Sequence, residues 1–184
     1  MNTYAIRPAY PEDATEIARI GLYGPEAASG LPGPTPDVAI TGFSNRILHP
    51  QDKSGIWVAE RDDTILGWRR LFDRGVTQNY RVSQSSTYIA KDWHAKGVGR
   101  ALLQFAKEQA LQRSFDTIVG WIKTDKVSSL KVVQSLGWAY VGICPGREIA
   151  TRSSRTTRTP CRCLGKCSAS MMRWKSQLSR SNSY

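Results

Sequence analysis

The apolar positions of residues 1–143 change their spacing several times, and each change predicts a new helix or strand. Alternation of apolar and polar residues predicts a strand, whereas apolar residues three and four apart predict a helix with one buried face. For the first half of the chain these rules predict, in order, a strand over residues 4–9, a helix opening at Pro11, an irregular Gly- and Pro-rich loop over 21–36, a helix over 35–48, and a hairpin with strands at 56–60 and 65–72.

The second half begins, after a loop around Gly75, with a strand over residues 83–90 that runs into a glycine pair. From Val98 the apolar residues fall on one face of a helix that ends near Arg113. The remaining elements are a continuous apolar strand over 116–122, typical of burial on both faces, a helix over 128–136 and a strand over 138–143. Four tryptophans within these patterns are predicted to lie in the core, namely Trp57, Trp68, Trp121 and Trp138.

Beyond residue 143 the pattern breaks. The stretch over residues 151–160 contains no apolar residue and shows no period. The chain has a net charge of +11, and residues 144–184 hold nine basic residues against one acidic residue. We therefore predict a near-neutral domain over residues 1–143 and an atypical basic tail over 144–184, either disordered or translated in a different reading frame.

Composition narrows the class of protein further. No apolar stretch approaches the roughly 20 residues that a membrane-spanning helix needs, and the first residues lack the order of a signal peptide, so we predict a cytoplasmic protein without a membrane partner. All four cysteines lie in the tail. Three of them, Cys161, Cys163 and Cys167, have no fourth ligand at an accepted spacing, and no metal is predicted.

The glycine pair, Gly97 and Gly99, stands where a predicted strand turns into a predicted helix. Glycines let the backbone pass close to a bulky anion, and the free N–H groups of a first helical turn stabilise phosphate charge. A tight turn without a ligand explains the same residues equally well. The spacing matches neither the Walker loop nor the three-glycine dinucleotide fingerprint, which disfavours ATP and NAD.

Residues 94–99, with the sequence His-Ala-Lys-Gly-Val-Gly, resemble the pyrophosphate loop of the GNAT acetyltransferases, which reads Arg or Gln, two residues, Gly, one residue, Gly or Ala. The resemblance extends over most of residues 3–143, and the phosphinothricin and methionine-sulfone N-acetyltransferases are the subfamily that the chain resembles most. It implies a mixed α/β fold with a central, mostly antiparallel sheet, splayed where the cofactor enters, and helices on both faces. It also implies further strands after residue 143, and because the tail shows none, we expect the sheet to lack its last strand and to expose an edge.

The resemblance implies acetyl-CoA as cosubstrate, held mainly by the end of one strand and by the glycine loop. Strand residues would offer backbone groups to the pantetheine arm, and the loop would hold the pyrophosphate, with charge-assisted contacts from Lys96 and Arg100. Lys126 and Ser129 stand where the family has an Asn and a Ser after its fifth strand. The implied cofactor-binding residues are Thr87, Tyr88, Ile89, Ala95, Lys96, Gly97, Val98, Gly99, Arg100, Lys126 and Ser129.

Gln84 occupies the position at which the resembling subfamily has its catalytic carboxylate. In such enzymes the substrate amine attacks the thioester directly, so the protein must place the amine and help to remove its proton. An amide orients an amine or a water but accepts no proton at neutral pH. His49 and His94, the only histidines, are interpreted as surface residues rather than bases.

The implied function is transfer of an acetyl group from acetyl-CoA to the amine of a small amino-acid-like substrate such as phosphinothricin, by a protein whose relatives pair as homodimers. Three alternatives stay open. The acceptor is another small amine or a protein terminus; the chain is a catalytically impaired acyl-CoA binding protein, which Gln84 and the tail favour; or the basic tail binds a polyanion such as a nucleic acid, the least favoured partner.

Overall fold

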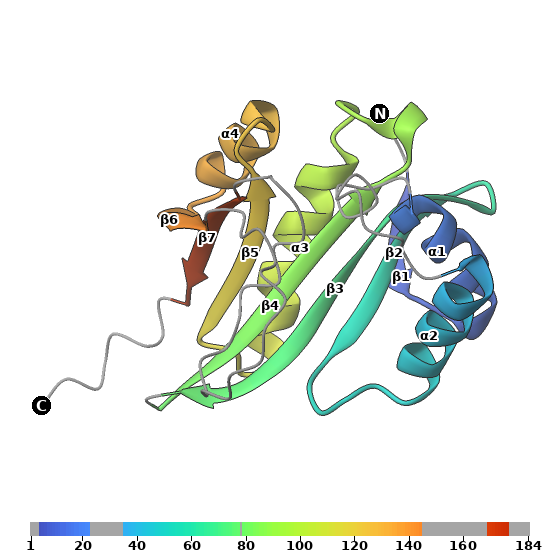
Figure 1. Cartoon of the computed structure of the whole chain (residues 1–184), viewed down its shortest axis with the longest axis horizontal. Coiled ribbons are helices and arrows are strands. Elements are labelled where there is room, and N and C mark those ends of the chain that lie inside the picture. The colour runs from blue at the N-terminus through green and yellow to red at the C-terminus, as the bar shows by residue number, and fades with distance from the viewer. Residues whose placement is uncertain (1–3, 23–34, 78, 145–168, 177–184) are drawn as a thin grey trace, which may run out of the picture.

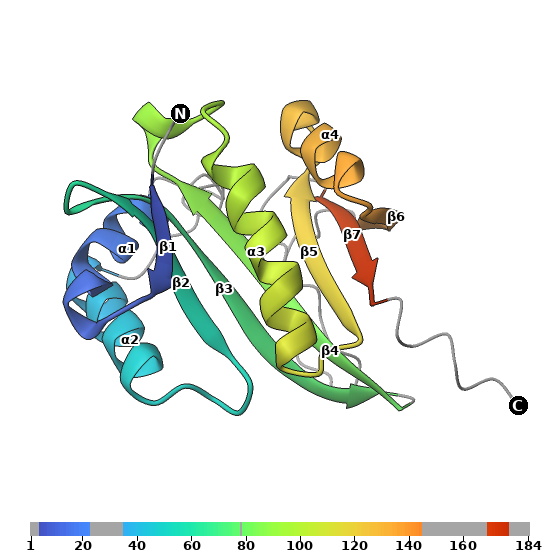
Figure 2. The same ribbon diagram turned by 180° about the vertical axis from the view of Figure 1, so that it is seen from behind.

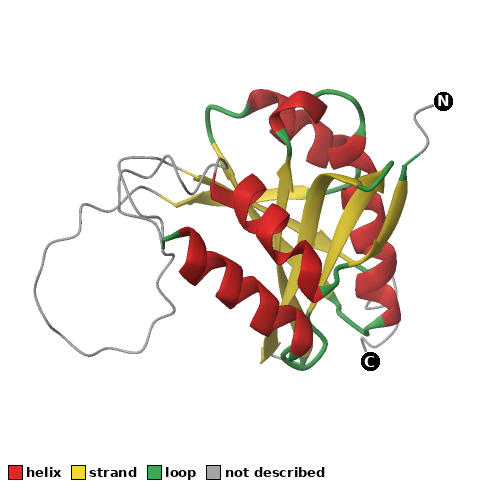
Figure 3. Cartoon of the chain, turned by 90° about the vertical axis from the view of Figure 1, so that its right-hand side faces the viewer, coloured by secondary structure: helices red, strands yellow, loops and turns green. Residues whose placement is uncertain are grey.

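Seven strands form one twisted sheet with helices on both faces (Figures 1 and 3). The structure, a computed structural model, describes residues 4–22, 35–77, 79–144 and 169–176. Its elements are β1 (Ala5–Pro8), the short 3-10 helix η1 (Pro11–Asp13), α1 (Ala14–Leu22), α2 (Pro36–Leu48), β2 (Gly55–Arg61), β3 (Thr64–Thr77), β4 (Tyr80–Ile89), η3 (Lys91–Trp93), α3 (Val98–Gln112), β5 (Thr117–Lys123), α4 (Val127–Ser135), β6 (Ala139–Cys144) and β7 (Ala169–Lys175).

The strand order across the sheet is β1-β2-β3-β4-β5-β7-β6. All neighbouring pairs are antiparallel except β4 and β5, which run parallel. The predicted mixed α/β fold with a mostly antiparallel sheet and helices on both faces is thereby confirmed.

The β2–β3 hairpin follows from its two turn residues. Asp62 and Asp63 both have positive φ, 49° and 58°, as a two-residue hairpin turn of the type that matches strand twist requires. Aspartate tolerates this left-handed conformation because its short polar side chain bonds locally. The predicted loop around Gly75 is wrong, because β3 continues to Thr77 and Gly75, with φ 82°, lies in a bulge where the register with β4 shifts.

The two faces of the sheet carry separate cores. On one face α1 and α2 cover a cluster that includes Ile17, Val58 and Trp68 (Figure 1). On the other face α3 packs across the middle of the sheet, and its Leu102 and Ala106 are fully buried (Figure 2). Helices α1 and α3 cover the sheet with the apolar stripe that their sequence spacing predicts, whereas Val38 of α2 is exposed and only part of that helix is buried.

Burial of the tryptophans and of β5 departs from the prediction in one place. Trp57, Trp68 and Trp138 lie in the core as predicted, at 3%, 1% and 5% exposure. Strand β5 is buried only at its start, and Trp121 is half-exposed. The reason is that β4 pairs with β5 only as far as Gly120, so that the second half of β5 is covered on one edge alone.

The end of the chain supplies a strand that the sequence analysis missed. Strand β7 lies between β5 and β6, paired antiparallel to both, and its Met172 is fully buried. The expectation that the sheet lacks its last strand is therefore wrong. Residues 145–168 and 177–184 lie outside the described residues, so an atypical basic tail remains a prediction there, and the Cys161–Cys167 cluster and most of the 21–36 loop fall outside as well.

Within the described ranges, no helix has the length and apolar character needed to span a lipid bilayer.

Candidate functional site

A gap opens in the sheet between the two parallel strands. The pairing of β4 with β5 begins at Val82 opposite Thr117 and ends at Ser85 opposite Gly120. Beyond this point β4 continues to Ile89 and β5 to Lys123, without pairing to each other. Residues 86–89 and 121–123 therefore line the two sides of a wedge that is closed at Ser85 and Gly120, and the predicted splay of the sheet is confirmed.

The glycine loop stands at the open end of this wedge. Ala95 and Gly97 both have positive φ, 60° and 85°, and Gly97 is the N-cap of α3 without a side-chain hydrogen bond. Alternating left-handed residues turn successive N–H groups toward one side, which forms a concave anion site. The first turn of α3 carries no acidic residue, so the positive end of the helix dipole is not neutralised there.

Two predicted loop contacts are already engaged within the protein. Arg100 Nη1 donates a hydrogen bond of 3.0 Å to Ser135 Oγ at the end of α4, and Lys96 Nζ lies 4.8 Å from the centre of the Trp93 ring. Both side chains are exposed beside the loop. Lys96 directly precedes the N-cap Gly97, and Arg100 lies in the first turn of α3.

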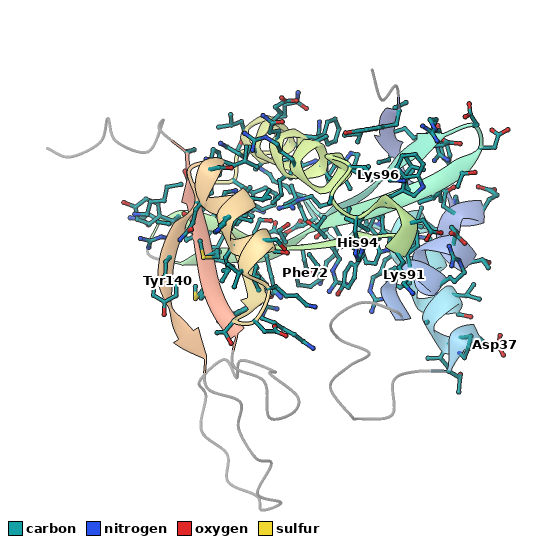
Figure 4. All side chains as sticks on the ribbon, turned by 90° about the horizontal axis from the view of Figure 1, so that it is seen from above. Asp37, Phe72, Lys91, His94, Lys96 and Tyr140 are labelled. Carbon is teal, nitrogen blue, oxygen red and sulfur yellow. The ribbon has the colours of Figure 1, made fainter. Side chains whose placement is uncertain are left out.

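The end of β4 is held by His94, which was interpreted from the sequence only as a surface residue. A ring nitrogen of His94, Nε2, lies 2.9 Å from the carbonyl oxygen of Ile89, an arrangement in which Nε2–H donates. His94 and His49 are both exposed, as predicted. The Ile89 carbonyl is thus occupied. Ala90 N donates to Leu66 O, so by alternation the backbone groups of Ser86 and Tyr88 bond to β3, and those of Thr87 are left on the β5 side for a ligand. Figure 4 shows His94 and Lys96 on the same segment above the sheet.

Lys126 and Ser129 stand on the opposite side of the wedge. Lys126 is the N-cap of α4 and Ser129 lies in its first turn, both exposed, just after the end of β5. The N-termini of α3 and α4 face the same end of the sheet (Figure 2). The fold therefore brings the predicted loop and these two residues to one edge, from segments far apart in sequence.

Gln84 lies at the closed end of the wedge, on the face covered by α1 and α2. It pairs with Phe72 of β3 and with Val119 of β5, and its side chain is half-buried. Because strand side chains alternate, Gln84 shares a face with Tyr88, whose ring stacks on Trp68 at 4.4 Å. Phe72 also borders a cavity of about 450 Å³ between the end of α2 and strands β2 and β3. The residues that line this cavity are Asn45, Arg46, His49, Gln51, Ser54, Gly55, Ile56, Arg70, Leu71 and Phe72.

The opposite face of β3 and β4 holds a buried cation that the sequence analysis missed. Arg69 is 2% exposed and donates from Nη1 to Thr87 Oγ1, while its Nε has no hydrogen-bond partner among the described residues. Burial lowers the pKa of the Arg69 guanidinium to about 9, which leaves it charged at neutral pH. The signal was present in the sequence, because alternation places Arg69 on the same side as Leu71.

Comparison with known proteins settles the family. The sequence profile of the acetyltransferase (GNAT) family matches residues 27–138, which is more than half of the chain. The chain belongs to the GNAT family of acetyltransferases. No curated protein sequence matches this acetyltransferase significantly.

Solved structures agree with this assignment at the level of the fold. A ribosomal-protein-alanine N-acetyltransferase from Brucella melitensis superposes with a TM-score of 0.71 at 18% identity, over 94% of this chain and 99% of the other. An N-acetyltransferase from Staphylococcus aureus Mu50 gives 0.72 at 18% identity, over 95% and 99%. A GNAT superfamily phosphinothricin acetyltransferase from Sinorhizobium meliloti, solved in complex with acetyl-CoA, gives 0.70 at 19% identity, over 94% and 88%.

Proposed function

We propose that this GNAT acetyltransferase moves the acetyl group of acetyl-CoA to the amine of a small amino-acid-like acceptor of the phosphinothricin type. The observation that carries the proposal is the wedge between β4 and β5, which begins at an uncapped helix N-terminus and closes beside Gln84. One end suits a pyrophosphate and the other suits a thioester.

The cosubstrate follows the wedge from its open end to its closed end. The pyrophosphate lies against Gly97 and the first turn of α3, where backbone N–H groups and the helix dipole stabilise its charge. The pantetheine arm then runs along residues 86–88 and takes the place of a strand partner, so that its amides bond to the backbone of β4. Four extended residues span roughly 13 Å, and the thioester therefore arrives near Ser85 and Gly120.

The reaction needs an amine that attacks the thioester carbonyl from the face opposite α3. Gln84 points to that face and orients the amine, or a water beside it, through its amide. Its amide does not remove the ammonium proton, so the amine enters as the small neutral fraction present at neutral pH. Placing the amine against the thioester then supplies most of the rate enhancement.

The acceptor approaches through the cavity beside Phe72. Arg46, His49 and Arg70 line this cavity, and none of its lining residues that the structure describes is a carboxylate. By register Arg70 lies opposite Ser86, next to the closed end of the wedge. A cationic lining of this kind suits an acceptor that carries a carboxylate or phosphinate in addition to its amine, which supports an amino-acid-like substrate.

One observation favours a second candidate function. With Gln84 in place of a base, the same wedge serves a protein that binds acyl-CoA and transfers the acyl group slowly or not at all. Turnover distinguishes the two candidates, since both require that acetyl-CoA binds.

Calorimetry with acetyl-CoA, ATP and NAD tests the shared part of the proposal. We expect acetyl-CoA to bind and the other two nucleotides to fail, and we expect Gly97→Trp to weaken acetyl-CoA binding by at least about tenfold. Gly75→Trp is the matched control, because Gly75 has nearly the same φ, 82° against 85°, equally open space for a side chain, and a place at the other end of the sheet. Unchanged acetyl-CoA affinity in Gly97→Trp would refute the loop assignment.

Mass spectrometry of the products from a panel of amines tests the transfer itself. Acetylation of phosphinothricin or of a related amino acid supports the acceptor class. Acetyl-CoA binding with no acetylated product from any amine supports the second candidate.

A further inference from the structure

Arg69 is a buried cation for which the described residues provide no anion. Its side chain is 2% exposed, its only hydrogen bond goes to the hydroxyl of Thr87, and no carboxylate pairs with it among the described residues. A buried guanidinium normally has a paired carboxylate, because removing an isolated charge from water is expensive. Within the part of the chain that the structure describes, Arg69 has no such partner.

Other unpartnered polar atoms surround Arg69. Among the described residues, the Ser85 hydroxyl and Trp138 Nε1 are buried and have no hydrogen-bond partner, in addition to Arg69 Nε. Ser85 lies diagonally across from Arg69, two residues before its register partner Thr87. Ser83, Ser85 and Thr87 all face α3, because they alternate with Gln84 and Tyr88 along β4. The two N–H groups donate and the hydroxyls are able to donate. A set of donors around a positive charge suits a negatively charged acceptor.

The cluster lies under the closed end of the wedge. Thr87, which accepts the hydrogen bond from Arg69, lies on β4 beyond the last residue that pairs with β5. Across the wedge, a Cβ added to Gly120 would meet Trp138 Cζ3 at 3.6 Å, so the Trp138 ring covers β5 there. The guanidinium carbon of Arg69 is 5.8 Å from the centre of that ring. Arg69 therefore lies between the two strands on the α3 side, next to the place assigned above to the thioester.

We propose that Arg69, Ser85 and Trp138 form a subsite for the terminal carboxylate of a dicarboxylic acyl-CoA, such as malonyl-CoA or succinyl-CoA. The proposal rests on the proposed function, because it takes from it the position of the thioester. It extends that function from the acetyl group to an acyl group that carries its own negative charge. The carboxylate supplies the acceptor atoms that Arg69 Nε, Trp138 Nε1 and the Ser85 hydroxyl lack.

The chemical step is the same transfer with a longer acyl group. The neutral amine attacks the thioester carbonyl, a C–N bond forms, the C–S bond breaks, and the proton released by the amine ends on the thiol of CoA or in solvent. The free carboxylate takes no part in bond making. It stays paired with Arg69 on the α3 side, while the amine comes from the side of Gln84.

Two pairs of thioesters of matched size provide the test in the unmodified protein. Malonyl-CoA and acetoacetyl-CoA differ by a carboxylate in place of a methyl ketone. Succinyl-CoA and butyryl-CoA have the same number of acyl carbons and differ by a carboxylate in place of the terminal methyl group. We expect at least one charged member to bind about tenfold or more tightly than its neutral partner, as measured by calorimetry with free CoA as reference. Equal or weaker binding of both charged members overturns the proposal.

Arg69→Met assigns the preference to this residue. The variant removes the charge and keeps an unbranched apolar side chain, and replacement of a buried unpaired charge by an apolar residue is often neutral or stabilising. We expect free CoA affinity to stay within about threefold and the charged-over-neutral preference to disappear. Arg74→Met, an exposed arginine farther along β3, is the matched control and should keep the preference.

The remaining outcomes distinguish failure of the Arg69 subsite from failure of the proposed function on which it rests. A preference that survives in Arg69→Met overturns the assignment to Arg69. A loss of acetyl transfer in Arg69→Met, with no preference for charged acyl groups in the unmodified protein, overturns it in favour of a role in polarising the thioester carbonyl. Failure of free CoA itself to bind overturns the proposed function, whereas binding of CoA without any preference for charged acyl groups overturns this inference alone. Should Arg69→Met fail to fold, the comparison of matched thioesters in the unmodified protein still decides.

Discussion

The two halves of the sheet, on either side of the wedge, are built in different ways. In the half formed by β1 to β4, strands that are neighbours in the sheet are also neighbours in chain order. In the half formed by β5, β7 and β6, the middle strand is the last one in the chain, and β6 reaches the sheet only through β7. In the first half, β2, β3 and β4 are thus joined by local hairpins, whereas the second half depends on a strand that comes from a distant segment.

This difference has a consequence for the wedge itself. The side formed by β4 is supported by β3 along its whole length. The side formed by β5 depends on β7, which pairs with it from Thr117 to Lys123. A site between the two halves therefore depends on the strand that the sequence reveals least.

The largest expected effect comes from removing β7. Deletion of residues 145–184 strips β5 of one neighbour and exposes the cluster around Ile118 and Trp138, and we expect the truncated protein to show no cooperative thermal transition by circular dichroism. Deletion of residues 177–184 alone leaves every described element in place and should unfold as the full chain does. A truncated protein that still unfolds cooperatively and binds acetyl-CoA would show that the second half does not need β7.

A smaller change in the same strand compares the halves more closely. Met172→Ala in β7 and Leu66→Ala in β3 each shorten a fully buried side chain, and each should lower the free energy of unfolding by about 2–5 kcal/mol. The two variants should differ in which strands lose protection from hydrogen exchange. We expect Met172→Ala to speed amide hydrogen exchange first in β5 and β6, with β2 and β3 protected, because the second half opens without the first. Simultaneous loss of protection in both halves would argue that the sheet unfolds as one unit.

The third prediction concerns Gln84, where the halves still pair. Gln84→Glu supplies a carboxylate of nearly the same shape, and it should raise kcat/KM for the best amine by at least about tenfold near neutral pH. Turnover of the unmodified protein should rise with pH as more of the amine is neutral, and the variant should show a flatter profile. Gln104→Glu, the same charge change at an exposed position of α3, should leave both unchanged. Equal or lower activity in Gln84→Glu, with acetyl-CoA affinity unchanged, would place the base elsewhere.

The smallest expected effect concerns the loop at the open end of the wedge. Ala95 has φ 60°, a conformation that is unfavourable for a residue with a Cβ, so Ala95→Gly should raise the free energy of unfolding by up to about 1 kcal/mol. Ala101→Gly, within α3, should instead lower it by about 0.5–1 kcal/mol. Chemical denaturation of both variants checks the opposite signs. A destabilised Ala95→Gly protein would mean that the loop is not strained.

Most elements of the first half were readable from local pattern. The paired aspartates at 62 and 63 indicate the turn of the hairpin. After β4, the spacing of apolar residues from Val98 likewise predicts α3. The glycine loop was predicted for the same reason, because a strand, two glycines and a helix form one contiguous segment. That Lys126 and Ser129 lie near this loop was implied only by the family resemblance. No local pattern predicts it, because the fold brings these distant segments together.

Strand β7 and the Arg69 cluster were not predicted, for one shared physical reason. Seven residues with two methionines and one tryptophan have no period long enough to distinguish a strand from a loop, and only β5 and β6 on either side make them a strand. Alternation places Arg69 on the same side as Leu71, but a charged hairpin residue is ordinarily exposed, and only the tertiary structure shows that Arg69 is buried beside Trp138. Its isolation also depends on residues far from it in sequence.

The sequence by itself determined the order of the helices and strands as far as residue 143, the first hairpin and the glycine turn before α3, because each depends on residues a few positions apart. The tertiary structure alone decided which strand completes the second half of the sheet, where the wedge closes, and that a charged side chain lies beneath it. Those features depend on contacts between segments separated by tens of residues, whose pairing no local period specifies.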